Sequence, residues 1–184
     1  MPTSEQTIVK RVTELVAADS VSSPDPSWDS SNRRVINHLS DYAERDGWAV
    51  DIHELEASAD GKANLIATLG NTDNLGDEPA GLVLSGHTDT VPFDAGGWAS
   101  DPLKLTERDG RLYGLGSTDM KGFFAVALEA ASVFDPAKFK APLYLLATAD
   151  EESTMRGARS LTKAQLPLAR AAIVGEPTDL RPMR

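Results

Sequence analysis

The sequence predicts an α/β protein in which a mixed, mostly buried sheet is flanked by helices on both faces. Three observations support this prediction. Two segments near the N-terminus repeat apolar residues at helical spacing. Several later segments are short continuous apolar runs, which are typical of strands covered on both faces. Residues 121–134 are apolar nearly all round, which indicates a helix buried against the sheet.

Length and composition narrow the function classes. The 184 residues predict one folding unit, because domains usually contain about 100–200 residues. The formal net charge of −10 and the lack of a cationic stripe argue against nucleic acid and against an anionic membrane as partners. No apolar run approaches the ~18 residues of a membrane span, and no signal peptide is visible, so we expect a cytoplasmic protein. Because cysteine is absent, any metal would be bound by histidine and carboxylate oxygen.

The first elements follow from periodicity. Apolar spacing predicts a helix over residues 4–18 and a second amphipathic helix through residues 35–43 that ends at Gly47. Residues 21–31 between them are rich in serine and proline and are predicted to form a loop. Residues 49–56 alternate apolar and charged side chains, which indicates a strand at the edge of the sheet.

The continuous apolar runs are predicted to be strands with both faces covered, and they lie at residues 82–84, 143–147 and 171–174. The last of these runs is expected in the interior of the sheet, yet only ten residues follow it. We therefore expect residues 1–184 to be the N-terminal part of a catalytic domain that is incomplete at its C-terminus.

Polar residues gather where the predicted strands end, and ligands of open α/β sheets bind at the carboxyl ends of strands. The residues concerned are His87, Asp89, Glu151, Glu152 and Glu176. Positions two apart in an extended chain point to the same side, so Asp89 can orient the ring of a metal-binding His87. The alternatives are a structural histidine at a strand end and ordinary solvated acids on the surface.

The position of the acids argues for a metal. Carboxylates at 4 Å repel by about 4 kcal/mol at an effective dielectric of 20 unless a cation or proton intervenes. Asp119 precedes the buried helix, whose N-terminus favours negative charge. With Asp119, the five acids Asp89, Asp119, Glu151, Glu152 and Glu176 carry −5, which two divalent ions reduce to −1. Oxygen and imidazole ligands suit zinc, cobalt or manganese, and paired ions are common in hydrolases.

Two competing motifs are weaker. Residues 114–119 begin like a dinucleotide-binding loop, but Asp119 stands where the third glycine should be and no clear apolar strand leads into the segment. A serine hydrolase that uses Ser85 or Ser117 with His87 remains open, although neither serine lies in a GxSxG turn.

Four ordered segments resemble the di-metal aminoacylase and carboxypeptidase family. They are GHTDTVPFD (residues 86–94), LYGLGSTDMKGFFA (112–125), ATADEE (147–152) and GEPT (175–178). The resemblance covers essentially the whole chain and implies a zinc-exopeptidase-like fold. It implies that His87 and Glu176 hold one metal, Asp119 bridges two metals, Glu152 holds the second, Asp89 orients His87, and Glu151 is the general base. It also implies a cis peptide bond between Asp119 and Met120.

The activity implied by the resemblance is hydrolysis of a small N-acyl amino acid with two Zn²⁺ or Co²⁺ ions in a complete active site. The segments match best the branch that converts N-acetylornithine to ornithine and acetate in arginine biosynthesis. The branch that acts on succinyl-diaminopimelate is the alternative.

Family members would continue into a lid or dimerisation domain and a returning catalytic segment, so the full-length protein is expected to be a homodimer. The returning segment would supply the second metal's histidine, because neither His38 nor His53 matches a family motif. We therefore expect one metal in this chain and little or no turnover, and the alternative of another class is a non-catalytic metal-binding half-domain.

Overall fold

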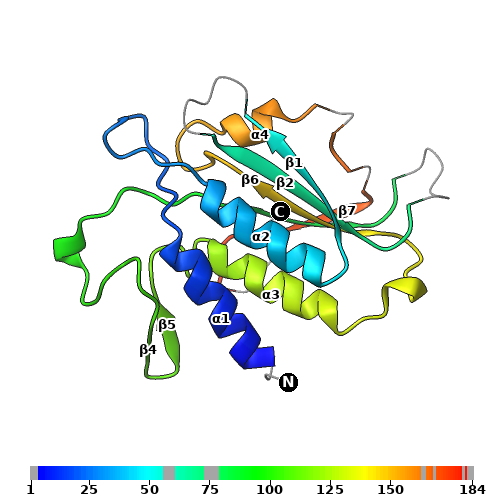
Figure 1. Ribbon diagram of the computed structural model, residues 1–184, viewed down its shortest axis with the longest axis horizontal. Coiled ribbons are helices and arrows are strands. Elements are labelled where there is room, and N and C mark those ends of the chain that lie inside the picture. The colour runs from blue at the N-terminus through cyan, green and yellow to red at the C-terminus, as the bar shows by residue number, and fades with distance from the viewer. Residues whose placement is uncertain are drawn as a thin grey trace.

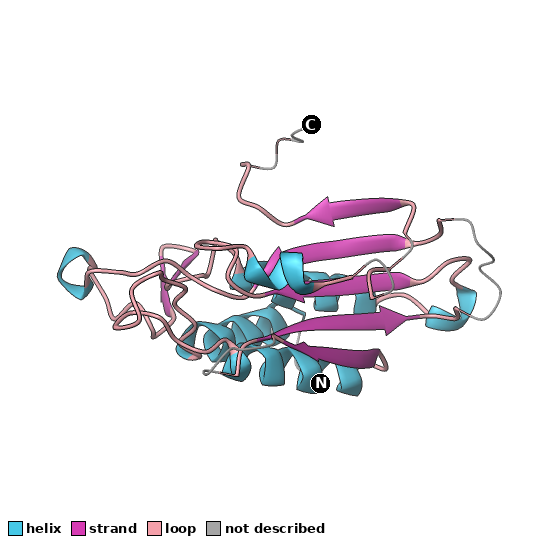
Figure 2. Ribbon diagram, turned by 90° about the horizontal axis from the view of Figure 1, so that it is seen from above, coloured by secondary structure: helices cyan, strands magenta, loops and turns pink. Residues whose placement is uncertain are grey.

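A five-stranded sheet in the order β1-β2-β6-β3-β7 forms the centre of the protein, beside a small sheet of β4 and β5. The computed structural model describes residues 4–55, 61–72, 79–162, 165–167, 169–179 and 181. Helices α1, α2 and α3 cover one face of the large sheet, and the short α4 lies on the other (Figures 1 and 2). The predicted α/β class, with a mixed sheet between helices, is confirmed.

The three long helices supply one side of the core. They are α1 (Ser4–Ala17), α2 (Arg33–Arg45) and α3 (Lys121–Ser132). Helix α2 packs on β1 and β2, whereas α3 packs on β3 and against α1. Their apolar faces bury Leu15, Leu39, Phe124 and Leu128 completely. The three predicted helices are therefore present, and α1 and α2 bury the apolar faces that their spacing indicates. None of the described helices is long and apolar enough to cross a membrane.

The strands of the large sheet combine two pairing modes. Their bounds are β1 Ala49–Glu54, β2 Ala63–Leu69, β3 Leu82–His87, β6 Leu143–Thr148 and β7 Ala171–Val174. Strands β1, β2 and β6 pair antiparallel in that order. Strand β3 is parallel to both β6 and β7, with Leu82 opposite Leu143 and Ala171. The carboxyl ends of β3, β6 and β7 consequently lie at the same edge of the sheet.

One prediction about the sheet is wrong. The apolar run at residues 171–174 was expected to be an interior strand, but β7 is an edge strand of the described sheet, with Ile173 51% and Val174 59% exposed. An apolar run indicates a strand whose side chains are stable when they are covered. It does not indicate which other segment of the protein covers them. The prediction for residues 49–56 is confirmed, because β1 is the opposite edge; Glu56 lies outside the described residues.

The remaining elements are short. They are β4 Thr106–Arg108, β5 Arg111–Tyr113, α4 Arg156–Ser160 and the 3₁₀ turns Ala95–Gly97 and Pro136–Lys138. Strand β5 does precede the glycine-containing segment 114–119, where no strand was predicted. In α4, a Cβ atom at Gly157 would lie 2.3 Å from the backbone oxygen of Ala149, so only glycine allows this approach of α4 to the end of β6.

Candidate metal centre

The strand topology brings the predicted site residues to one place. His87 is the last residue of β3, Glu151 and Glu152 follow β6, and Glu176 follows β7. Asp119 lies just before α3. Two groups of ligand atoms result, each within 4.8 Å: His87 with Glu151 and Glu152, and His87 with Asp119 and Glu176. Both groups of donors therefore share one imidazole.

The two ring nitrogens of the buried His87 face different partners. Its Nδ1 lies 3.0 Å from the backbone oxygen of Asp89 and 3.6 Å from Oδ1 of the same residue. Its Nε2 lies 3.0 Å from Asp119 Oδ1 and 3.8 Å from Glu176 Oε1. Because the Asp89 backbone oxygen can only accept, Nδ1 carries a hydrogen, and Nε2 is the atom turned toward the carboxylates, where a cation would sit.

Asp89 also organises the acids that follow β6. Its Oδ1 accepts a hydrogen bond from the backbone N–H of Glu151 at 3.1 Å, and its Oδ2 accepts one from Glu152 at 3.0 Å. Burial raises the pKa of Asp89, but the interactions with His87 and with these two N–H groups outweigh burial and hold the pKa below its usual value. The sequence indicated the contact with His87, whereas the contact with the Glu151–Glu152 backbone was not predicted.

The electrostatics of the cluster favour a bound cation. Burial raises the pKa values of Glu152 and Glu176. His87 lowers them, but the neighbouring carboxylates of Asp119, Glu151 and Asp89 raise them, and the net pKa of each is above its usual value. Burial lowers the pKa of His87, but Asp89, Asp119 and Glu176 together raise it to about 9. The site thus holds more negative charge than it can leave uncompensated, which is the environment that a divalent ion neutralises.

The fold brings together all six residues predicted for the site. The two groups of ligand atoms do not show which role each residue has. Asp119 shares a group with Glu176 and not with Glu151 and Glu152, so its role as a bridge stays a prediction. The peptide bond between Asp119 and Met120 is cis, which confirms that expectation. His53 lies on β1 and contacts Gln165 and Asp51, away from both groups.

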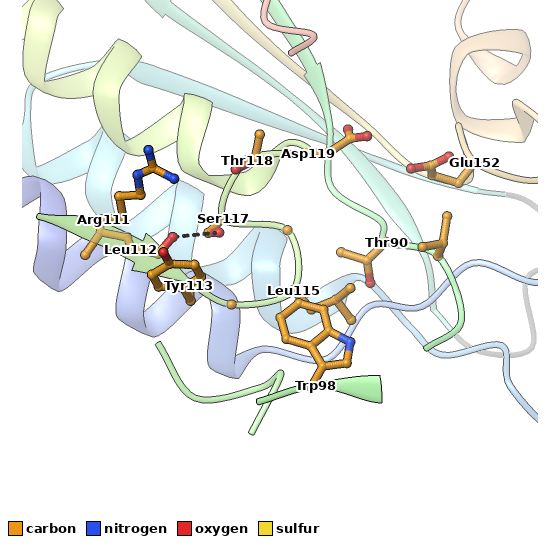
Figure 3. A pocket seen from close by; sticks show the side chains of 13 residues that line it. Thr90, Trp98, Arg111, Leu112, Tyr113, Leu115, Ser117, Thr118, Asp119 and Glu152 are labelled. Atoms are coloured by element: carbon orange, nitrogen blue, oxygen red, sulfur yellow. Dashed lines mark hydrogen bonds between the residues drawn. The ribbon is translucent and has the colours of Figure 1, made fainter. Parts of the chain in front are cut away.

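A cavity of about 790 Å³ opens beside the cluster. Asp119 and Glu152 border it on one side, and Thr90, Trp98 and Tyr113 lie around the rest of it (Figure 3). A volume of this order accommodates a small organic molecule. Asp119 and Glu152 therefore face a space in which a substrate the size of an amino-acid derivative fits.

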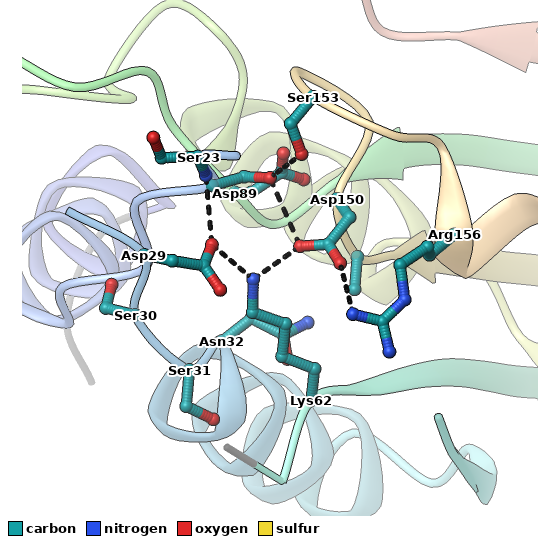
Figure 4. A network of polar contacts seen from close by, with 12 residues as sticks. Ser23, Asp29, Ser30, Ser31, Asn32, Lys62, Asp89, Asp150, Ser153 and Arg156 are labelled. Carbon is teal, nitrogen blue, oxygen red and sulfur yellow. Dashed lines mark hydrogen bonds and ion pairs between the residues drawn. The ribbon is translucent and has the colours of Figure 1, made fainter. Parts of the chain in front are cut away.

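Sequence reasoning missed the residues behind the cluster. Lys62 lies between Asp29 and Asp150 in a buried polar network (Figure 4). Asn32 joins Ala63 to Thr88, the neighbour of His87. The sequence contained one indication of this network: the polar residues Lys62 and Asn64 lie at the start of an otherwise apolar segment. Polar side chains that are buried in such a segment usually have hydrogen-bond partners.

An α/β sheet with a histidine and carboxylate cluster at the ends of its parallel strands is the architecture of a metal-dependent hydrolase domain. A sequence model of the family described as Peptidase family M20/M25/M40 matches residues 83–183, and the chain belongs to this family. The resemblance noted from the sequence is thereby confirmed, and the chain is an enzyme domain by family.

Named relatives and solved structures agree with this assignment. The chain is 48% identical over 170 residues to acetylornithine deacetylase of Pasteurella multocida (strain Pm70), covering 92% of this chain and 43% of that protein. It is 45% identical over 178 residues to acetylornithine deacetylase of Proteus mirabilis (strain HI4320), covering 97% and 44%. The chain thus spans less than half the length of these relatives.

Among solved structures, human carnosine dipeptidase 1 superposes with a TM-score of 0.70 at 23% identity, over 93% of this chain and 38% of that one. The M20 family metallo-carboxypeptidase Sso-CP2 from Sulfolobus solfataricus gives a TM-score of 0.62 at 17% identity, over 95% and 37%. At these identities the likeness shows a shared fold.

Proposed function

We propose that this chain forms the metal-binding part of an enzyme that hydrolyses N-acetylornithine to ornithine and acetate. The observation that carries the proposal is the position of His87 Nε2 between carboxylates from two other segments, beside an open cavity. The 48% identity to relatives named acetylornithine deacetylase supports the choice of substrate. A cytoplasmic role in arginine biosynthesis belongs to the same proposal.

The residues fit a site for two divalent ions, Zn²⁺ or Co²⁺. His87 and Glu176 would hold one ion, Asp119 would bridge, and Glu152 would hold the second. When bound, such ions lower the pKa of water and polarise a carbonyl group. Asp89 keeps the His87 ring oriented through Nδ1 and fixes the backbone of Glu151.

Glu151 is proposed as the general base. Its carboxylate would take a proton from the attacking water and later deliver it to the departing amine, so that the acyl group leaves as a carboxylate. Its carboxylate lies within 4.8 Å of ligand atoms of His87 and Glu152, which supports a base close to a water bound at this group.

The rest of the active site is proposed to come from a lid or dimerisation domain and a returning segment outside these 184 residues, in a homodimeric full-length enzyme. Two facts support this. The relatives are more than twice as long as the matched part, and the two ligand groups in the described part of the chain share His87 as their one imidazole. A second ion would then need a histidine from elsewhere.

The test compares two proteins in an assay of ornithine release with saturating Zn²⁺ or Co²⁺. One is the 184-residue chain, and the other is a chimera in which this chain replaces the matched part of the Pasteurella multocida relative. We expect turnover by the chimera and almost none by the chain alone. If the chimera preferred succinyl-diaminopimelate, the proposal that N-acetylornithine is the substrate would be wrong. If the two proteins had equal rates, the proposal that part of the active site lies outside the 184 residues would be wrong.

Within the active chimera, Glu151→Gln should retain its metal and lose turnover by about 10²- to 10⁴-fold, because an amide has the same shape but cannot accept a proton. Metal content measured on the same sample is the control. Turnover like that of the unsubstituted chimera would remove Glu151 from the role of base.

A further inference from the structure

The chain turns sharply at Asp150, immediately before the two acids of the cluster. Asp150 has a φ of 57°, in the left-handed region that side chains other than glycine seldom adopt. Its own side chain is buried and points away from the metal ligands, where Oδ1 accepts a hydrogen bond from Ser22 Oγ at 3.1 Å. A residue in this conformation persists only where its surroundings fix it.

Lys62 supplies the strongest of those contacts. Its Nζ donates to Asp150 Oδ1 at 2.6 Å and to Asp29 Oδ1 at 2.7 Å, and its side chain is only 3% exposed (Figure 4). Lys62 lies just before β2 and Asp150 two residues after β6, at the end of this antiparallel pair where Leu65 lies opposite Ala147. The ammonium group therefore ties the turn after β6 both to the start of β2 and to the loop that contains Asp29.

The charge of Lys62 is maintained by these partners. Burial lowers the pKa of Lys62, but the hydrogen bonds and charges of Asp150 and Asp29 outweigh burial and raise the pKa above its usual value. A buried ion pair of this kind is costly to break. Without Lys62, the buried Asp150 would keep only the more distant Arg156, 3.9 Å from its Oδ2, as a cationic neighbour among the described residues. The contact therefore resists displacement of Asp150.

Asn64 holds the same segment two residues further along β2. Its Oδ1 accepts from the backbone N–H of Ala149 at 3.0 Å, and its Nδ2 donates to the backbone oxygen of Gly157 at 2.9 Å. Gly157 in turn donates to the backbone oxygen of Ala149 at 3.1 Å. The segment from Ala149 to Gly157 is thus closed at its base by Asn64 and anchored at its turn by Lys62.

The geometry of Glu151 and Glu152 depends on this anchoring. Both backbone N–H groups donate to Asp89, so the orientation of the two carboxylates toward His87 follows from where the backbone after Asp150 lies. Lys62 itself is absent from both ligand groups and from the lining of the cavity. Its contact with the segment that carries the cluster is the one with Asp150.

We propose that Lys62 is a positioning residue of the active site: by joining Asp150 to Asp29, it holds the Glu151–Glu152 backbone against Asp89 and so aims both carboxylates at His87. The catalytic relevance of this role rests on the proposed function, whereas the positioning itself is a property of the folded chain.

Amide hydrogen exchange in the 184-residue chain tests the proposal without relying on activity. Lys62→Met should accelerate exchange of the Glu151 and Glu152 amides at least about tenfold relative to Leu145, a fully buried residue of β6. Asp29→Asn removes the charge of Asp29 and leaves the ion pair between Lys62 and Asp150 in place, so it should give a smaller increase at the same two amides. This second variant tests the proposal if Lys62→Met does not fold. Arg11→Met, which removes a buried cation paired with Asp46 at the end of α2, is the matched control and should leave them unchanged.

Unchanged exchange of both amides in Asp29→Asn and in folded Lys62→Met overturns the proposal, and so does acceleration that is equal at Leu145, because that result indicates a general loss of stability. A Zn²⁺ or Co²⁺ titration of the unsubstituted chain distinguishes failure of the proposed metal-dependent function from failure of the positioning role of Lys62. No binding there, with selective acceleration in the variants, contradicts the proposed function and supports the positioning role of Lys62.

Discussion

At the scale of single residues, His87 is the point on which both ligand groups depend. Its Nε2 faces Asp119 and Glu176, and the same ring belongs to the group with Glu151 and Glu152. No other described histidine belongs to either group. Loss of this imidazole should therefore affect every ion that the chain binds.

We expect the chain to retain close to one equivalent of Zn²⁺ or Co²⁺ after dialysis and His87→Ala to retain almost none, because the remaining donors are carboxylates that lie partly exposed to water. Metal analysis of the dialysed proteins measures this directly. The control is His53→Ala, whose ring contacts Asp51 and Gln165, and it should bind as the parent does. Full retention by His87→Ala would place the ion elsewhere.

Residue chemistry was the part of the site most accessible from the sequence. Histidine and acids at the ends of apolar runs predicted a cluster, because parallel strands end at a common edge. The buried polar contacts behind the cluster could not be predicted from the sequence. Lys62 and Asp150 are far apart in the chain, and their contact follows from the register of two strands, which composition and spacing do not specify.

At the scale of elements, α4 is a short helix whose position is fixed by its approach to the end of β6. Gly157 makes this approach possible, because a Cβ atom there would lie 2.5 Å or less from both backbone nitrogen and oxygen of Ala149. The contact connects the helix to the segment that carries Glu151 and Glu152.

Gly157→Ala should therefore destabilise the fold by about 1–3 kcal/mol, the usual cost of forcing an atom into a packed site. Urea unfolding of the purified chain gives the free energy of unfolding. Gly97→Ala is a suitable control, because a Cβ atom there meets nothing within 4 Å. Equal stability of the two variants would show that α4 can move away from β6 at little cost.

The predictability of elements followed their length and pattern. Helices α1 and α2 are long and periodic, α3 is long and apolar nearly all round, and each was expected at its observed place. Strands β4 and β5 are too short for a period to be visible. The residues of β7 were predicted correctly, but its position in the order of strands was not. An apolar segment does not indicate which strands pair with it.

At the scale of the whole molecule, the exposed strand β7 leaves both apolar side chains and backbone groups at an edge of the described sheet. Edges of this kind pair with other chains unless charge or a covering segment prevents it. Ile173 and Val174 thus form a surface on which two copies of the chain can associate.

We expect the 184-residue chain to associate reversibly at micromolar concentrations and Ile173→Lys to shift it toward monomer, because a charge on an edge strand opposes pairing. Sedimentation velocity over a range of concentrations measures the shift. Val133→Lys, at a more exposed apolar position just after α3, is the control and should leave association unchanged. A chain that is monomeric at all concentrations, or equal effects of the two variants, would contradict self-pairing through β7.

The order of strands in the sheet also has a consequence for synthesis on the ribosome. Strands β2 and β3 are neighbours in the sequence, but β6 lies between them in the sheet, so β3 has neither of its partners until residue 143 and beyond have been made. At about 5–20 residues per second, the 56 residues from Thr88 through Leu143 take roughly 3–11 s. During that interval the nascent chain carries an unpaired apolar strand, which is a target for chaperones. The residues of the histidine and carboxylate cluster can meet only after the delay has ended.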